Sequence, residues 1–265
     1  MDLGLQDKVI IVTGGGAGIG EGITRACLAE GARVVIFGRA SEQVKRFMAE
    51  METAKAACEL VPTELSEDQA CADAVKHVLD SYGDIFGIVN NAGANDGVGL
   101  ESGSPEAFMQ SIRRNLLHYY SIVHFALPSL KASRGAVVNI SSKVALTGQG
   151  GTSAYAAAKG AQLALTREWA AELIPFGIRV NCVLPAEVMT PLYKRWINTF
   201  PNPAEKLAKI TERIPLEQRM TTSAEIAAAT VFLLSPTQSG HTTAQHVIVD
   251  GGYVHLDRSL RSGTS

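Results

Sequence analysis

Apolar residues along this chain fall into seven short runs, and segments of helical character separate them. Most of the runs are rich in β-branched residues and end near glycine, asparagine or serine, a pattern typical of buried strands. We predict strands at residues 8–13, 33–37, 59–62, 85–89, 136–140, 178–184 and 246–249.

Helices are predicted in the intervals between these strands. Gly31 is placed to end the first helix, Ser41 to cap the second, and Ser104 with Pro105 to start the fourth. The predicted helices span residues 19–30, 41–54, 66–81, 104–130, 153–173 and 222–234. This alternation predicts an α/β fold, a Rossmann-type doubly wound sheet of seven parallel strands flanked by helices, in a single domain over residues 1–265.

The stretch from Pro185 to Pro215 interrupts the alternation with irregular, proline-containing sequence. It follows the sixth strand, at the edge where sheets of this kind bind ligands. We predict a mobile substrate lid at about 185–215, with one or two short helices. The polar residues at about 258–265 are expected to fray, whereas 253–256 could pack against the domain.

Composition limits the classes of partner and compartment. Hydrophobic residues make up 46% of the 265 and charged residues 19%, as in a compact globule. The net charge is −2 and no run of Lys or Arg exceeds two, so we expect no nucleic-acid partner. We find no signal peptide and no apolar stretch near the ~20 residues of a membrane helix, so a cytoplasmic protein without a membrane partner is expected. The four cysteines and six histidines form no ligand cluster, which predicts reduced thiols and no metal site.

A glycine-rich loop, Thr-Gly-Gly-Gly-Ala-Gly-Ile-Gly at 13–20, joins the first strand to the first helix. Glycines let the backbone approach a pyrophosphate, and the helix N-terminus offers free N–H groups and the positive end of its dipole. Glycines alone can form a tight turn, but this position after a strand and before a helix predicts dinucleotide binding. We assign to the cofactor site Gly14, Gly16, Gly18, Ile19 and Gly20.

The tip of the second strand bears on the choice between NADP and NAD. An acid there would bind both ribose hydroxyls and repel a 2′-phosphate, but the sequence has Gly38 and Arg39. The planar guanidinium of Arg39 can pair with a phosphate, which favours NADP. If Arg39 is only a solvated surface residue, NAD remains the alternative.

Tyr155 and Lys159 lie four residues apart near the start of a predicted helix, so both project from one face. A tyrosine titrates near ~10, and a nearby ammonium or an oxidised nicotinamide would stabilise its phenolate. Tyr155 could then act as base in oxidation and as acid in reduction. Ser142, at the end of the fifth strand, could bind the substrate oxygen. Taken singly, the pair could arise by chance on a helix and the serine could belong to a turn.

The ordered set of motifs is more specific than any one of them. The glycine-rich loop is followed by Asn90-Asn91-Ala92-Gly93 after the fourth strand, and then by the polar residues of the catalytic candidates. In this order the chain resembles the short-chain dehydrogenase/reductase family along nearly its whole length. The resemblance implies that Asn115 holds a water relaying protons to Lys159, and it implies a catalytic set of Asn115, Ser142, Tyr155 and Lys159.

The same resemblance implies further cofactor contacts and an assembly. Asn91 and Gly93 would line the adenosine side and Thr190 would bond the carboxamide. The other cofactor residues that it implies are Glu64, Leu65, Ala92, Tyr155, Lys159, Pro185 and Val188. It also implies a homotetramer, with the helices near 104–130 and 153–173 at one interface. One departure from the family is Ala186-Glu187, because most relatives have glycine after the proline. Glu187 either binds a substrate hydroxyl or is a solvated loop acid.

The substrate candidates are largely polar, with one aromatic plane, which suits a small polyhydroxylated ligand because buried hydroxyls need partners. They are Asn95, Asp96, Lys143, Gln149, Glu187 and Trp196, and any of them could instead be loop surface. Segments 1–9, 95–96, 145–150, 185–193 and 249–258 resemble family members that oxidise a sugar at its anomeric carbon. This implies hydride transfer from C1 of an aldose to NADP, giving the lactone.

Two other functions stay open at this point. An NADPH-dependent carbonyl or 3-ketoacyl reductase would need an apolar acyl channel under the 185–215 lid, which the polar candidates disfavour. A non-enzymatic dinucleotide-sensing protein would need no acid/base residues, whereas this sequence carries the complete set.

Overall fold

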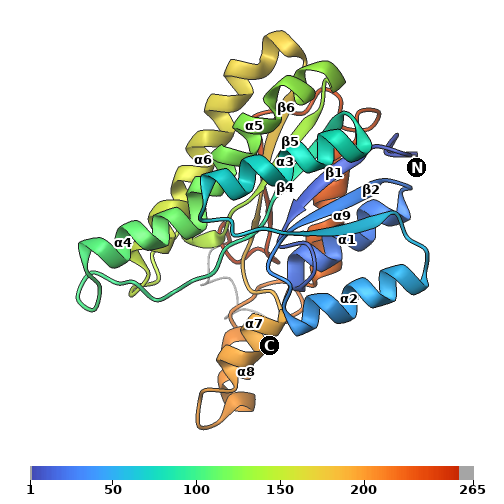
Figure 1. The fold of residues 1–265 in the computed structure, drawn as a ribbon. Helices are drawn as coiled ribbons and strands as arrows, with labels where there is room; N and C mark the ends of the chain where they lie inside the picture. Colours follow the sequence, from blue (N-terminus) through green and yellow to red (C-terminus); the bar gives the residue numbers. More distant parts are fainter. Residues whose placement is uncertain (1, 257–265) are drawn as a thin grey trace.

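One parallel sheet lies between two layers of helices in the computed structural model, which describes residues 2–256 (Figure 1). Within these residues seven strands pair in the order β3-β2-β1-β4-β5-β6-β7, and every pairing is parallel. The strands are β1 (Val9–Thr13), β2 (Arg33–Gly38), β3 (Cys58–Pro62), β4 (Ile85–Asn90), β5 (Ala136–Ile140), β6 (Arg179–Pro185) and β7 (His246–Val249). The predicted Rossmann-type sheet is confirmed, and its order reverses between β1 and β4.

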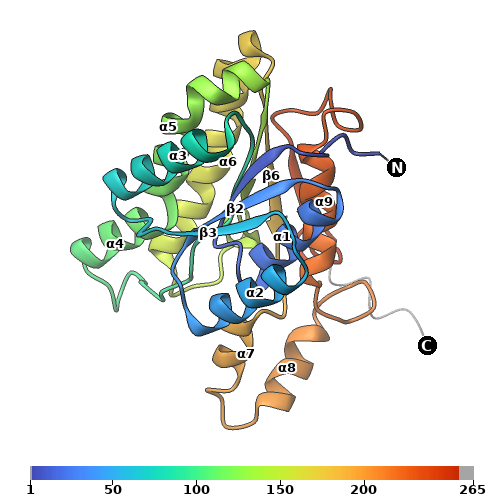
Figure 2. The same cartoon turned by 45° about the vertical axis from the view of Figure 1, so that its right-hand side comes forward.

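The helices cover the sheet in two groups. Helices α1, α2 and α9 lie on one face and α3, α5 and α6 on the other (Figures 1 and 2). The helices of the described chain are α1 (Gly18–Ala29), α2 (Glu42–Thr53), α3 (Asp68–Tyr82), α4 (Pro105–Ile112), α5 (His118–Ser133), α6 (Ser153–Leu173), α7 (Pro191–Ile197), α8 (Pro203–Thr211) and α9 (Ser223–Leu234).

The β-branched strands form the core on both faces of the sheet. Along β1, Ile10 and Val12 pack toward α1 and α9, while Val9 and Ile11 pack toward α3 and α5. Successive side chains of a strand point to opposite faces, so a strand covered on both sides is apolar at every position. This burial fixes the carboxyl ends of the strands, where the candidate site lies.

Two helix predictions need correction. The helix expected from 66 begins at Asp68, because the backbone N–H and the hydroxyl of Ser66 both donate to the Glu64 carboxylate. The helix expected over 104–130 is divided into α4 and α5 by a π-helical segment, Arg113–Leu117. The caps at Ser41 and Ser104 are as expected, since each hydroxyl accepts a backbone N–H three residues on.

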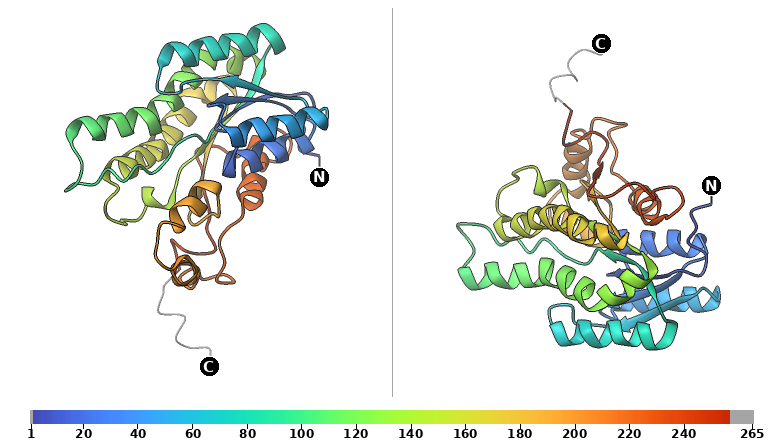
Figure 3. Two further views of the ribbon diagram at one scale, coloured as in Figure 1. Left: turned by 60° about the horizontal axis from the view of Figure 1, so that its bottom comes forward. Right: turned by 90° about the horizontal axis from the view of Figure 1, so that it is seen from above.

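The predicted lid contains the two short helices α7 and α8, which project beyond the carboxyl ends of the strands (Figures 2 and 3). Its return to the domain is fixed where the Thr221 N–H donates to the Glu187 carbonyl at 3.0 Å. Tyr253 also packs, with its ring 4.1 Å from the Lys143 ammonium. The predicted frayed tail, about 258–265, lies outside the described residues.

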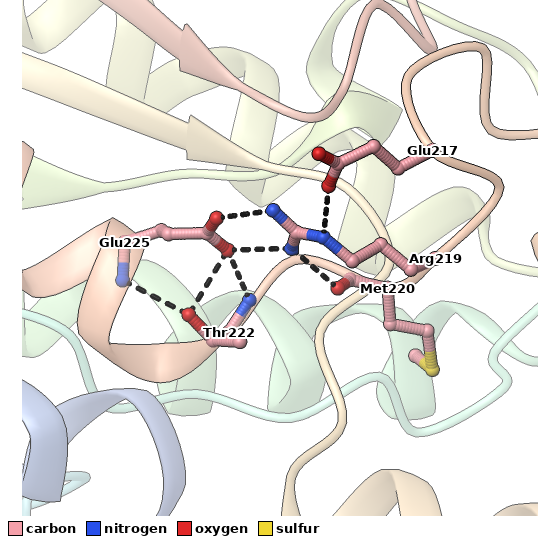
Figure 4. A network of polar contacts seen from close by, with 5 residues as sticks. All are labelled: Glu217, Arg219, Met220, Thr222 and Glu225. Atoms are coloured by element: carbon pink, nitrogen blue, oxygen red, sulfur yellow. Dashed lines mark hydrogen bonds and ion pairs between the residues drawn. The ribbon is translucent and has the colours of Figure 1, made fainter.

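A polar network holds the chain between the lid and α9 (Figure 4). Arg219 donates to Glu217 at 2.5 Å and makes two bonds to Glu225, at 2.7 and 3.0 Å. Glu225 also closes a capping box with Thr222 at the start of α9, and Arg219 holds the pKa of Glu225 down at about 2. These bonds therefore hold residues 217–225 in place at the start of α9.

None of the described helices is both long and apolar enough to cross a bilayer. Between residues 2 and 256, no three His, Cys, Asp or Glu side chains are grouped as metal ligands.

Candidate active site

The glycine-rich loop is a close-packed cradle. A Cβ on Gly14 would lie 3.2 Å from the Asn91 amide nitrogen, and one on Gly18 would lie 3.2 Å from Thr190. Both glycines have positive φ, +64° and +58°, a conformation that side chains disfavour. The loop therefore brings Asn91 and Thr190 to its rim, and their contact with a dinucleotide stays a prediction. At Gly16 the missing side chain faces Val44 of α2, so this glycine also permits helix packing.

Thr13, at the end of β1, ties this loop to the segment after β4. Its hydroxyl accepts the backbone N–H groups of Asn91 at 2.8 Å and Ala92 at 2.9 Å, and its carbonyl accepts the Asn91 amide at 2.9 Å. A Cβ on Gly93 would lie 2.8 Å from Asn115 Oδ1 and 3.8 Å from Lys159 Nζ. The predicted cofactor segment thus adjoins the catalytic candidates. The role of Thr13 was not expected from the sequence, although its position directly before the glycines could have indicated it.

Charges of both signs lie at the tip of β2, where the sequence predicts a contact with the adenosine ribose. Arg39 is exposed at the tip of β2. The hydrogen bonds from Ser66 lower the pKa of Glu64, with smaller contributions from Arg39 and Arg114. Arg39 and Glu64 therefore lie near each other at this corner, and Arg114 joins them although the sequence did not suggest it. Leu65 is half-buried against the helix-covered core.

Ser142, Tyr155 and Lys159 meet at the end of β5 and the first turns of α6. The Ser142 hydroxyl lies close enough to the Tyr155 phenol to lower its pKa, while Lys159 Nζ lies 5.6 Å from the Tyr155 ring centre and donates to the Ile140 carbonyl at 2.8 Å. Burial raises the pKa of Tyr155 to about 12, which Ser142 opposes and Asp96 reinforces. Burial also lowers the pKa of Lys159 to about 8. The site therefore keeps both groups neutral more readily than water does.

Asn115 is fully buried in the π-helical segment, and its polar groups have partners. Its Oδ1 accepts the Ala94 N–H at 2.8 Å, its Nδ2 donates to Ser111, and its backbone carbonyl accepts the Gln162 amide at 2.9 Å. Asn115 thus links the segment after β4 to α6. The proton relay expected at this residue stays a prediction.

Lys143, the residue after Ser142, forms an ion pair with Glu187, which lies at the start of the predicted lid. Their side chains are only 11% and 12% exposed, so the alternative of a solvated loop acid is wrong. Burial raises the pKa of the Tyr193 phenol, and the negative charge of Glu187 raises it further. Tyr193 and Tyr253 were not expected beside this ion pair, because only the folding of distant segments brings them next to it.

The other substrate candidates lie in different settings. Trp196 is 44% exposed and packs edge-on against Tyr193, with ring centres 5.1 Å apart. Asp96 accepts the Ser111 hydroxyl at 2.9 Å and faces Arg114 at 3.4 Å, so it is already paired. Asn95 and Gln149 are exposed. The structure thus joins Lys143 with Glu187 and does not join Asn95 or Gln149 to them.

The chain is similar to known proteins over most of its length. A family model described as enoyl-(acyl carrier protein) reductase matches residues 14–254. L-fucose dehydrogenase of Bos taurus is 37% identical over 92% of this chain and 88% of its own length. A crystal structure of the Cj0485 dehydrogenase is 44% identical, with a TM-score of 0.92 and 98% of each chain covered. The ligand-free aldohexose dehydrogenase of Thermoplasma acidophilum is 30% identical, with a TM-score of 0.85, over 100% of this chain and 99% of that one.

The chain belongs to the short-chain dehydrogenase/reductase family. It is an oxidoreductase of that family, whose members use NAD or NADP as hydride carrier.

Proposed function

We propose that the protein transfers a hydride from C1 of an aldose, L-fucose or a sugar of similar stereochemistry, to NADP⁺ and releases the lactone. The observation that carries this proposal is the largely buried Lys143–Glu187 pair directly beside Ser142, because a sugar presents several hydroxyls that need buried polar partners. The bovine relative named L-fucose dehydrogenase and the neighbour named aldohexose dehydrogenase support the same substrate class.

In this proposal Ser142 binds the C1 oxygen and Tyr155 accepts the proton of the C1 hydroxyl. The Lys159 ammonium stabilises the resulting phenolate. When bound, NADP⁺ supplies the hydride acceptor and a positive charge that favours ionised Tyr155. Oxidation is therefore expected to speed up as pH rises, and the reverse reduction to slow down, because Tyr155 must lose a proton in one direction and supply one in the other.

In this proposal the polar candidates and Trp196 contact different parts of the sugar. Glu187 accepts hydrogen bonds from sugar hydroxyls and Lys143 donates to their oxygens, while the plane of Trp196 covers the ring. Gln149 and Asn95 lie on exposed loops and contribute only when the lid closes over the substrate.

Kinetics with a series of substrates test this function. Purified protein should reduce NADP⁺ with L-fucose, and Glu187→Gln should raise the KM for the sugar about tenfold with a smaller change in kcat, because a charged acceptor is lost. Lys194→Gln, which alters an exposed lid residue, serves as the matched control.

Two alternatives give different results in the same assays. If no aldose reduces NADP⁺ while a ketoacyl thioester consumes NADPH, the protein is a 3-ketoacyl reductase, an alternative supported by the 31% identical relative of Thermotoga maritima named 3-oxoacyl-[acyl-carrier-protein] reductase. If nicotinamide nucleotides bind but no alcohol or ketone reacts, a dinucleotide-sensing role replaces catalysis.

The NADP preference rests on Arg39, which is exposed at the tip of β2 where no acid stands. The cofactor residues proposed around the dinucleotide are those of the glycine loop, Asn91, Gly93 and Thr190, together with Pro185, Val188, Glu64 and Leu65. Arg39→Asp should lower kcat/KM for NADP⁺ about 100-fold and leave NAD⁺ within a few-fold, because a guanidinium–phosphate pair becomes a repulsion. Arg46→Asp makes the same charge change on an exposed part of α2. Equal effects of the two variants on the cofactor ratio would refute the assignment.

We also propose that the protein works as a cytoplasmic homotetramer. Gly160 supports this, because a Cβ placed there would meet no atom within 4 Å and a second α6 helix could approach closely. Sedimentation at micromolar concentration that shows only monomer would exclude the tetramer.

A further inference from the structure

A second tyrosine lies beside Lys159. Tyr119, in the first turn of α5, is fully buried, and its hydroxyl donates to the Ile140 carbonyl at 3.0 Å. Lys159 Nζ donates to the same carbonyl at 2.8 Å and to Tyr119 Oη at 3.4 Å. The ammonium, the phenol and the carbonyl thus form a closed triangle. Lys159 Nζ lies 5.6 Å from the ring centres of both Tyr119 and Tyr155.

The Lys159 ammonium has only uncharged acceptors among the described residues. The titratable groups that face it are Tyr155 on its own helix, Tyr119 and His118 on α5, and Cys182 on β6. Burial lowers the pKa of His118 to about 4 and raises the pKa of Cys182 to about 12, so both are uncharged near neutral pH. The Ile140 carbonyl and the Tyr119 hydroxyl therefore hold the ammonium without help from a carboxylate.

Tyr119 also connects Lys159 to Asn115. The Gln162 amide donates to the Asn115 carbonyl at 2.9 Å, and the same side chain lies close enough to Tyr119 to oppose the rise that burial causes in the pKa of that phenol. Asn115 and Gln162 are both fully buried. Buried side chains thus extend from the π-helical segment, through Gln162 and Tyr119, to the ammonium. Gln162 Oε1 has no hydrogen-bond partner among the described residues, so the ammonium is held by its own two acceptors, the Ile140 carbonyl and the Tyr119 hydroxyl.

We propose that Tyr119 is a positioning residue for hydride transfer: its hydroxyl holds the Lys159 ammonium against the Ile140 carbonyl, in reach of Tyr155. The inference rests on the roles proposed above for Tyr155 and Lys159. Tyr119 itself does not touch the reacting atoms. It acts through Lys159, because an ammonium with a second acceptor stays charged and in place, and a charged Lys159 favours the Tyr155 phenolate.

The test is Tyr119→Phe, which keeps the buried ring and removes only the hydroxyl. With L-fucose and NADP⁺, kcat of oxidation at neutral pH should fall about tenfold while both KM values stay within about twofold. The rise of kcat with pH should move about one pH unit upward, because a less stable ammonium leaves Tyr155 harder to ionise. Tyr120→Phe makes the same substitution one residue on, at an exposed ring, and should change neither.

A second measurement needs neither sugar nor cofactor. Carbon-13 NMR of the lysine Cε groups follows the titration of Lys159, identified by the signal that Lys159→Met lacks. The pKa of Lys159, which burial lowers to about 8, should be lower still in Tyr119→Phe and unchanged in Tyr120→Phe. An unchanged Lys159 titration, or an unchanged pH profile with only a loss of thermal stability, overturns the proposal. If Tyr155→Phe keeps full activity, the proposed catalytic roles fail instead, whatever the NMR titration shows.

Discussion

Tyr155→Phe is expected to lose about three orders of magnitude in kcat, since a positioned acid/base group contributes roughly 10²–10⁴ to rate. The variant keeps the ring and removes the hydroxyl whose pKa Ser142 lowers. Cofactor affinity should persist, because the glycine cradle and Thr190 are unchanged. The residual rate should also lose its dependence on pH, because the group whose ionisation produced that dependence is absent. Assays of NADPH formation from pH 6 to pH 10 measure kcat and its dependence on pH. A fluorescence titration with the cofactor measures its affinity.

The matched control is Tyr82→Phe, which removes a phenol that bonds to Glu59 at 2.7 Å, far along the chain from the site. It should keep wild-type kcat. A Tyr155→Phe variant that retains more than about a tenth of the wild-type rate would remove Tyr155 from the acid/base role. Loss of cofactor binding in the same variant would instead point to a disrupted site.

The elements most clearly readable from the sequence are those whose signal is local. The run Val-Ile-Ile-Val-Thr predicts β1 because a strand covered on both faces must be apolar throughout. Tyr155 and Lys159 are placed together by their spacing on one helix, and Ser142 by its position at a strand end. Each of these inferences needs only a few neighbouring residues.

The remaining features depend on contacts between distant segments. Lys143 and Glu187 pair across 44 residues, and Tyr119 meets Lys159 across 40. The spacing within α5 does not reveal which of its residues faces α6, because the π-helical segment before it shifts the register by part of a turn. The helix start near Ser66 was misplaced for a local reason, because Ser66 bonds to the side chain of Glu64, two residues earlier.

The difference between the features that the sequence predicts and those that it does not predict has a physical explanation. Secondary structure follows from propensity and periodicity, which act over a few residues, whereas a polar pocket requires buried groups to find partners in other elements. The candidate polar residues could therefore be named from the sequence. Their pairing, which separates the buried Glu187 from the exposed Asn95, required the fold.

Lys159→Met should remove activity and raise stability. Burial lowers the pKa of Lys159 from 10.5 to about 8, so at neutral pH the folded protein holds an ammonium in surroundings that disfavour it. The penalty, by linkage, is about 3 kcal/mol below pH 8. Methionine has a similar length and no charge, and the Tyr119 hydroxyl still bonds to the Ile140 carbonyl. We expect kcat to fall more than about 100-fold and the free energy of unfolding at pH 7 to rise by about 2 kcal/mol.

The pH dependence of this gain provides its sharpest test. Between about pH 8 and pH 10.5 the folded wild-type protein has released the Lys159 proton while the unfolded chain still binds it, so wild-type stability increases with pH in this window. Lys159→Met lacks this contribution, and the difference between the two proteins should therefore shrink as pH rises. Urea unfolding at fixed protein concentration measures the difference, with Lys194→Met as the control at an exposed lysine. The prediction is wrong if the variant is less stable than wild type at pH 7, or if the difference in stability does not change with pH. Either result would mean that the Lys159 ammonium stabilises the fold instead of destabilising it.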